Sequence, residues 1–286
     1  MMSRGWEVIE EIDLPGNAAR VGEEAVQLLA APQCPSGQMD LILTGGQLAL
    51  QLHESCGHPI ELDRVLGTEA SYAGMSFLTV DKLGSFRYGS EKVNVTADAT
   101  LPGGLGSFAY DDEGVPAQCI DIVKNGVFVG YLTSRETAAE IGLTAGGGAM
   151  RADGWGSLPL IRMTNVNLLP GEMSLEEIIA STERGIIMGE NTSWSIDDKR
   201  LNFQFGCELG QLIEDGRIVG IVRNPTYTGI TPRFWGSCDA VADATTWKVW
   251  GVPNCGKGEP GQCARVGHGV SAARFRNVTV GVLGNE

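Results

Sequence analysis

The feature that most constrains this chain is the hexapeptide His53-Glu54-Ser55-Cys56-Gly57-His58, which holds two of its three histidines. Neutral imidazole is the commonest zinc ligand, and a glutamate beside a zinc-held water can accept its proton. The alternative is two unrelated histidines on a buried helix, with Glu54 solvated or paired. Because two of the three histidines in the chain lie in this motif, the His-Glu-x-x-x-His pattern favours a zinc hydrolase site.

The spacing of the two histidines limits the backbone that can present them. The usual zinc-hydrolase helix has its histidines four residues apart, whereas His53 and His58 are five residues apart. At about 100° per residue, a regular α-helix would point them about 140° apart. A single π-turn, with about 4.4 residues per turn, would bring both to one face. Gly57 and Pro59 allow the other solution, a helix that ends between the histidines.

Length and composition indicate a globular protein. The chain has 286 residues, 43% of them hydrophobic, which is enough for the core of one large domain or two small ones. The net charge of −14 argues against a duplex nucleic-acid partner, because such partners require clustered Lys and Arg. Residues 1–20 contain no apolar run and no later stretch is long enough to span a membrane. The sequence therefore predicts a cytoplasmic protein without a membrane partner.

Hydrophobic periodicity predicts an α+β fold with mixed, mostly antiparallel sheets and a few helices, one of which carries the histidine motif. A helix that packs on the rest of the protein is expected at Asn17–Ala30, before Pro32. A second helix is expected at Ser174–Glu183, with Ser174 as N-cap, Glu177 at the capping-box position, and Gly185 ending it.

Short strands with hairpin turns account for much of the remaining chain. A buried strand is expected at Asp40–Thr44, leading through two glycines into the helix of the histidine motif. Period-two alternation predicts strands at Val93–Ala97 and Ile120–Val123, and Asn125-Gly126 and Asp215-Gly216 are strong hairpin signals. The glycine-rich stretch 145–156 is expected to be a flexible loop, with a mobile flap over a substrate as the alternative.

Ligand chemistry alone does not identify the third zinc ligand. The seven cysteines are odd in number and scattered, which favours free thiols and one metal ligand over a disulfide framework. Three C-terminal residues and three carboxylates after the motif are able to bind zinc: Cys255, Cys263, His268, Glu61, Asp63 and Glu69. Cys255 is expected in a glycine-flanked turn with Lys257 nearby, a setting that favours a thiolate, although most turn cysteines bind no metal.

Five motifs, in this order, resemble the TldD/PmbA family of metallopeptidases, and its TldD branch most closely: His53-Glu54-Ser55-Cys56-Gly57-His58, Arg162-Met163-Thr164-Asn165, Leu169-Pro170-Gly171, Glu177-Ile178-Ile179-Ala180-Ser181 and Cys255-Gly256-Lys257. The resemblance runs from near residue 5 to the C-terminus. It implies a cytosolic zinc metallopeptidase in which His53, His58 and Cys255 hold Zn²⁺ and Glu54 is the general base. It also implies that His268, in a Val-Gly-x-Gly stretch, is a surface or core histidine and not a ligand.

The same resemblance implies substrates and partners. Peptides or unfolded polypeptide segments are expected as substrates, bound as extended strands. A dimer is expected, either with a second copy or with a PmbA/TldE-like paralogue that lacks the His-Glu motif. Typical members carry a further N-terminal domain, so residues 1–286 are expected to form the C-terminal metallopeptidase domain, as one domain or two closely packed subdomains.

Two other functions are compatible with the family. In one, the chain is a non-catalytic partner or regulatory subunit, although the intact His53, Glu54 and His58 count against it. In the other, zinc stabilises a protein-binding module. A fourth zinc ligand from Cys263 or His268 would favour that second alternative.

Overall fold

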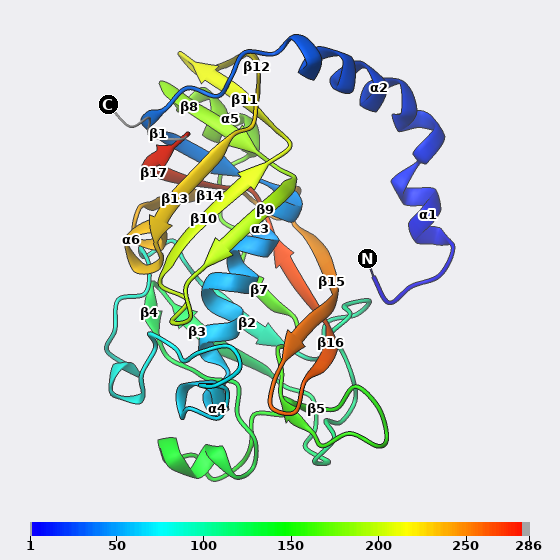
Figure 1. Cartoon of the computed structure of the whole chain (residues 1–286), viewed down its shortest axis with the longest axis vertical. Helices are drawn as coiled ribbons and strands as arrows, with labels where there is room; N and C mark the ends of the chain where they lie inside the picture. The colour runs from blue at the N-terminus through cyan, green and yellow to red at the C-terminus, as the bar shows by residue number, and fades with distance from the viewer. Residues whose placement is uncertain (1, 282–286) are drawn as a thin grey trace.

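The computed structural model describes residues 2–281 and has an α+β architecture, as the sequence predicts (Figure 1). Its strands form a nine-stranded sheet, a four-stranded sheet and two two-stranded ribbons. Pairing is antiparallel in most ladders; β1 (Gly37–Leu43) and β8 (Arg184–Met188) form a parallel one. Within residues 2–281, no helix combines the length and apolar character needed to cross a membrane.

The helices are α1 (Glu7–Ile12), α2 (Leu14–Ala30), α3 (Gly45–Leu52), α4 (Leu62–Val65), α5 (Leu175–Ala180) and α6 (Thr231–Gly236). The large sheet runs in the spatial order β12 (Arg217–Arg223), β11 (Leu209–Glu214), β8, β1, β17 (Ala273–Val280), β13 (Thr226–Ile230), β10 (Asn202–Cys207) and β9 (Asn191–Ile196), and β14 (Cys238–Val241) also pairs with β17. The four-stranded sheet has the order β4 (Val127–Phe128), β3 (Cys119–Lys124), β2 (Val95–Asp98) and β7 (Val166–Leu168). The ribbons are β15 (Lys248–Lys257) with β16 (Gln262–Val270), and β5 (Met150–Arg151) with β6 (Leu160–Ile161).

Strand β1 is the buried strand that the sequence predicts before the histidine motif. Leu41, Ile42 and Leu43 are fully buried between β8 on one side and β17 on the other. The chain then enters α3 through Gly45, whose φ of +50° is a conformation that favours glycine. The motif therefore follows directly on a central strand of the large sheet.

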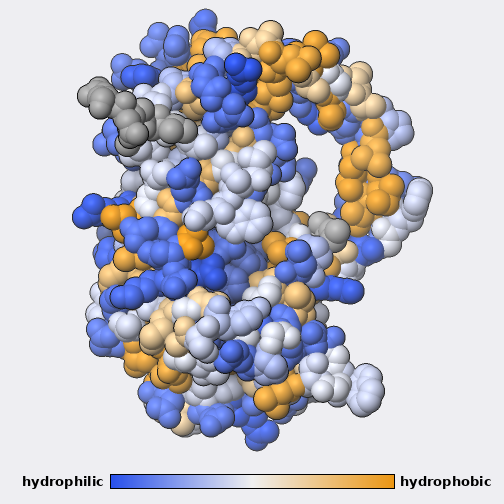
Figure 2. Space-filling view, in the orientation of Figure 1, coloured by the Kyte–Doolittle hydropathy of each residue, from blue (hydrophilic) through white to orange (hydrophobic). Residues whose placement is uncertain are grey.

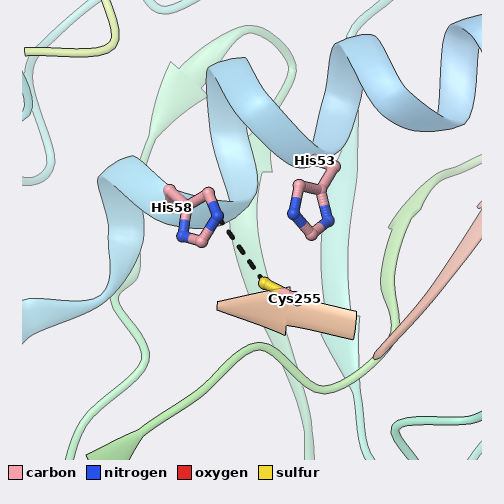
Figure 3. A group of neighbouring side chains, drawn as sticks. All are labelled: His53, His58 and Cys255. Atoms are coloured by element: carbon pink, nitrogen blue, oxygen red, sulfur yellow. Dashed lines mark hydrogen bonds between the residues drawn. The ribbon is translucent and has the colours of Figure 1, made fainter. Parts of the chain in front are cut away.

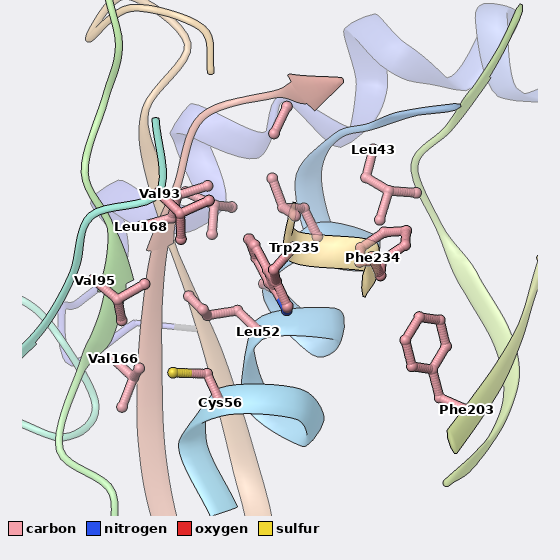
Figure 4. Packing of buried hydrophobic residues seen from close by; sticks show 14 of the residues in the cluster. Leu43, Leu52, Cys56, Val93, Val95, Val166, Leu168, Phe203, Phe234 and Trp235 are labelled. Carbon is pink, nitrogen blue, oxygen red and sulfur yellow. The ribbon is translucent and has the colours of Figure 1, made fainter. Parts of the chain in front are cut away.

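The main hydrophobic core encloses the motif helix between the two larger sheets (Figure 4). Leu52 and Cys56 of the helix contribute to the same buried cluster as Leu43 and Phe203 of the large sheet and Val95 of the four-stranded sheet. Burying one apolar face of the helix in this way fixes the direction of its opposite face.

Both predicted hairpin turns are present. Asn125 and Gly126 join β3 to β4 with φ values of +47° and +77°, and Asp215 and Gly216 join β11 to β12 with +46° and +74°. Two consecutive positive φ angles are the type I′ geometry that Asn-Gly and Asp-Gly favour. The glycine-rich stretch 145–156 is irregular, as expected, apart from strand β5.

Helix α5 begins as predicted and ends earlier. Ser174 caps it, and the reciprocal bonds of a capping box with Glu177 are both present. The predicted end at Gly185 is wrong, because Gly185 belongs to β8 and pairs with Asp40 of β1. A Cβ at Gly185 would lie 2.7 Å from the Asp40 carbonyl oxygen, so close strand packing accounts for this glycine.

The predicted N-terminal helix exists as α2, but the expectation that it packs on the protein is wrong. Among the described residues of α1 and α2 none is buried, and apolar side chains such as Trp6, Val26 and Leu29 are exposed. The two helices arch away from the sheets, and Figure 2 shows apolar residues along this arm (Figures 1 and 2). Helical periodicity predicts an apolar face and carries no information on what covers it.

Candidate metal centre

The histidine motif forms a π-turn, one of the two solutions that the five-residue spacing predicts. Residues His53–Gly57 are π-helical, and the His58 amide donates to the His53 carbonyl, five residues back. A 3₁₀ turn at His58–Ile60 follows, so the helix does not end between the histidines. Both rings therefore project on the same side of the helix, toward strand β15 (Figure 3).

Buried side chains support the wider turn from the core side. The Tyr88 hydroxyl donates to the Ser55 carbonyl at 3.0 Å, a group that lies inside the π-turn. The indole Nε1 of Trp235 donates to Ser55 Oγ at 2.9 Å, and this hydroxyl donates to the Gln51 carbonyl. Because a π-turn interrupts the regular ladder of helical hydrogen bonds, these contacts satisfy polar groups that would otherwise be costly to bury.

Replacing Gly57 by alanine is expected to destabilise the fold by about 1–3 kcal/mol, the usual cost of overpacking a core. An added Cβ would lie 2.2 Å from Sδ of Met163, which is fully buried. Urea unfolding of metal-free protein measures the change. Gly236→Ala, in a helix with nothing within 4 Å of the new Cβ, is the matched control and should stay within about 0.5 kcal/mol. Equal stability of the two variants would contradict this packing.

Strand β15 brings Cys255 to the two histidines. One potential donor atom each from His53, His58 and Cys255 lies within 4.8 Å of the others, and all three residues are buried. Cys255 Sγ is 3.6 Å from His58 Nε2 (Figure 3). Nitrogen and sulfur ligands of a tetrahedral zinc are also about 3.6 Å apart, given bonds of about 2.05 and 2.3 Å. The donor set and the His58–Cys255 distance thus fit zinc.

The prediction that Cys255 lies in a turn is wrong. The residue is within β15, where it pairs with Ala264 of β16, and the ladder continues to Lys257 opposite Gln262. Flanking glycines suggest a turn in the sequence, but Gly256 adopts the strand and pairs with Cys263. Cross-strand pairing with β16 decides the conformation here.

The other candidate ligands lie outside this group in the described structure. Cys263 is exposed, and all seven cysteines are free thiols, as expected. Glu61, Asp63 and Glu69 surround Lys257. His268 is a core histidine, fully buried behind His53, as the resemblance implies.

Hydrogen bonds at Nδ1 orient both histidine rings. His58 Nδ1 lies 3.1 Å from Glu61 Oε2, and His53 Nδ1 lies 2.8 Å from His268 Nε2. These contacts leave Nε2 of each ring as the nitrogen available to a metal, an arrangement typical of metal-binding histidines.

The burial of the histidines changes their protonation. Burial holds the pKa of His53 well below its usual value and lowers the pKa of His268 to about 4. Burial also lowers the pKa of His58, but the neighbouring Cys255 and Glu61 outweigh the effect of burial and raise that pKa to about 9. A metal binds only neutral imidazole, so it would displace any proton that His58 carries and bind His53 in its neutral form.

Comparison with known proteins identifies the family. Residues 36–282 match the PmbA/TldA metallopeptidase C-terminal domain. The chain belongs to the TldD/PmbA family. A metalloprotease of Methanothermobacter thermautotrophicus is 34% identical over 277 residues, which are 97% of this chain and 58% of that protein. A metalloprotease TldD homologue of Haemophilus influenzae is 30% identical over 276 residues, 95% of this chain and 55% of that protein.

The fold of this TldD/PmbA family member also matches solved structures. TldE of Thermococcus kodakarensis superposes with a TM-score of 0.74 at 20% identity, over 94% of this chain and 56% of that one. At this identity the likeness shows the fold. The chain thus spans a little over half the length of each of these relatives.

The predicted general base, Glu54, is buried beside the first histidine and held by an arginine that the sequence did not single out. Arg200 Nη1 donates to the Glu54 carboxylate. Arg200 lies in the turn between β9 and β10, with a φ of +63°, and its amide donates to the Asp197 carbonyl at 2.8 Å. The large sheet therefore contributes to the site of this TldD/PmbA protein through one turn.

Two further buried cations hold the segment around Cys255. Lys257 Nζ lies 3.2 Å from Glu61, 2.9 Å from Asp63 and 2.6 Å from Glu69, so this lysine is paired with carboxylates and not with the Cys255 thiol. Arg162 Nη2 donates to the Cys255 carbonyl at 2.5 Å. Both residues lie in motifs that carried the family resemblance, yet their partners depend on contacts distant in sequence.

Proposed function

We propose that this chain is a zinc-dependent peptidase domain that hydrolyses peptide bonds in peptides or unfolded polypeptide segments. In this proposal His53, His58 and Cys255 hold Zn²⁺, and Glu54 is the general base. The observation that carries the proposal is the buried group of two imidazoles and one thiol next to a carboxylate, in a chain whose relatives are named metalloproteases.

The donor set favours a catalytic zinc over a structural one. Structural zinc sites have four protein ligands, whereas catalytic sites have three and keep one position open. Among the described residues this group has three members. Cys263 is exposed and His268 Nε2 is engaged with His53, which argues against either as a fourth ligand. When bound, zinc supplies a Lewis acid and lowers the pKa of a water molecule from 15.7 to about 7.

In this proposal Glu54 transfers the protons of hydrolysis. It would accept a proton from the attacking water and return it to the leaving amine, the two steps of general acid–base catalysis. The guanidinium of Arg200 donates to one oxygen of this carboxylate and fixes its position. The second oxygen remains available to the water.

The substrate and partners follow from the same proposal. Strand β9 is the terminal strand of the large sheet in the described structure, and the turn after it carries Arg200. An extended peptide added to such an edge would run toward Glu54 and be bound through its backbone.

We also propose that the protein forms a dimer, with a second copy or with a TldE-like paralogue lacking the motif. The proposed location is cytoplasmic, and residues 1–286 are proposed to form one domain or two closely packed subdomains.

A zinc titration of the parent chain and Cys255→Ser tests the proposed function. The parent should bind about one zinc per chain and cleave unfolded peptides in its presence. Cys255→Ser should weaken zinc binding more than about 100-fold, the upper limit for outer-shell changes, because it removes a ligand. Cys263→Ser, which alters an exposed thiol on the adjacent strand, is the matched control and should bind zinc as the parent does. A parent chain that binds no zinc would contradict the proposal.

A further inference from the structure

We infer that His268 is a positioning residue, which fixes the His53 ring in the tautomer that presents Nε2 to the metal. The inference rests on the proposed zinc site and adds a residue to it. His268 lies on β16, opposite Trp250 of β15, and is fully buried. Its two ring nitrogens contact two different groups, His53 Nδ1 at 2.8 Å and the Val166 carbonyl at 3.0 Å.

The Val166 contact determines where the protons lie. A carbonyl oxygen can only accept, so His268 Nδ1 must carry a hydrogen and donate it. In a neutral His268 ring, Nε2 is then an acceptor. The bond between the two rings needs one hydrogen, so His53 Nδ1 must donate it. His53 is left with its lone pair on Nε2.

The opposite assignment is disfavoured by the surroundings. It requires a His268 imidazolium that donates from both nitrogens, inside a core where it has no exposed surface. A buried cation without a carboxylate partner is costly, and the groups that His268 contacts are a carbonyl and another imidazole. The neutral assignment satisfies both nitrogens of His268 and Nδ1 of His53, and leaves His53 Nε2 for the metal.

His268 also connects the β15–β16 ribbon, which carries Cys255, to the helix that carries His53. The β15–β16 ribbon carries Cys255 on one strand and His268 on the other. Val166 belongs to β7 of the four-stranded sheet, so the chain from carbonyl to His268 to His53 joins that sheet to the motif helix. A shift of the ribbon would therefore displace Cys255 and, through His268, also change the orientation of the His53 ring.

Nuclear magnetic resonance of the metal-free parent tests the tautomer directly. Histidines are labelled with a nitrogen isotope, and long-range proton–nitrogen couplings distinguish the two neutral tautomers. Because the chain contains only three histidines, the spectrum can be assigned by single substitutions. We expect His53 and His268 both to carry their proton on Nδ1. A His53 ring protonated on Nε2 in the parent chain would overturn the inference.

Zinc affinity of two His268 variants supplies the second readout. His268→Leu keeps bulk and removes the acceptor, so it should weaken zinc binding about 10- to 100-fold and abolish the single His53 tautomer. His268→Gln can accept from His53 through its carbonyl and donate to Val166 through its amide, and should restore the tautomer and most of the affinity. An affinity of His268→Leu within twofold of the parent would overturn the inference.

Two controls separate the positioning role of His268 from the proposed zinc ligand set on which it rests. Val266→Ala removes a fully buried side chain from the same strand and should leave the His53 tautomer and zinc affinity unchanged, so loss of packing alone is excluded. If Cys255→Ser loses zinc while His268→Leu retains it, the positioning role is wrong and the proposed ligand set survives. If neither variant affects zinc binding, the ligand set itself is wrong.

Discussion

Glu54→Gln is expected to slow peptide-bond hydrolysis about 100- to 10,000-fold, the range that a general acid–base residue contributes, while zinc stays bound. Glutamine has nearly the same shape and can still accept a hydrogen bond from Arg200, so the π-turn and the ligand residues should keep their places. The amide cannot take a proton from water at neutral pH. The loss should therefore appear in kcat, with zinc affinity unaffected.

Cleavage of an unfolded peptide substrate, measured together with zinc content, checks this prediction. The exposed Glu183→Gln makes the same chemical change away from the histidine motif and should keep full activity. Glu54→Gln with zinc bound and more than a tenth of the parental rate would show that Glu54 is not the base. A non-catalytic partner subunit, in contrast, would show no cleavage in the parent either.

Lys257→Met is expected to destabilise the fold by about 3–5 kcal/mol, the usual cost of removing one partner from a buried ion pair. Lys257 is fully buried and pairs with Glu61, Asp63 and Glu69. Without it, three buried carboxylates would repel one another and lose their nearest cation. Because Glu61 also holds His58, the same change should loosen the orientation of that ring.

Urea unfolding of metal-free protein measures this loss without interference from zinc. Lys248→Met, at the exposed start of the same strand, is the matched control and should change stability by less than about 0.5 kcal/mol. If Lys257→Met lowers the free energy of unfolding by less than about 1 kcal/mol, protonation or water must reduce the repulsion among the three carboxylates. In that case the cluster would contribute little to the geometry around Cys255.

Local features of the fold could be predicted where a short stretch of sequence determines its own geometry. The five-residue spacing of His53 and His58 leaves few backbones able to bring both rings to one metal, and the π-turn is one of the two that were expected. Asn125-Gly126 and Asp215-Gly216 predict hairpins because both residues tolerate positive φ. The capping box of Ser174 and Glu177 is equally local.

The rest of the site depends on contacts between residues far apart in sequence. Nothing adjacent to Arg200 indicates that it binds Glu54, 146 positions earlier. The glycines around Cys255 suggest a turn, but pairing with β16 makes a strand. His268 has no motif that marks it as the partner of His53. Such contacts follow from the sheet topology, which periodicity alone does not determine.

The order in which the strands pair has a consequence for the synthesis of this protein. The central strand β1 pairs with β17, near the far end of the chain, and His58 and Cys255 are 197 positions apart. A nascent chain exposes the motif helix, with its apolar face, long before β15–β17 emerge to enclose it. Under the proposed ligand set, a chain that ends before residue 255 can complete neither the central sheet nor the metal centre. Zinc uptake would therefore mark chains whose synthesis has passed β15.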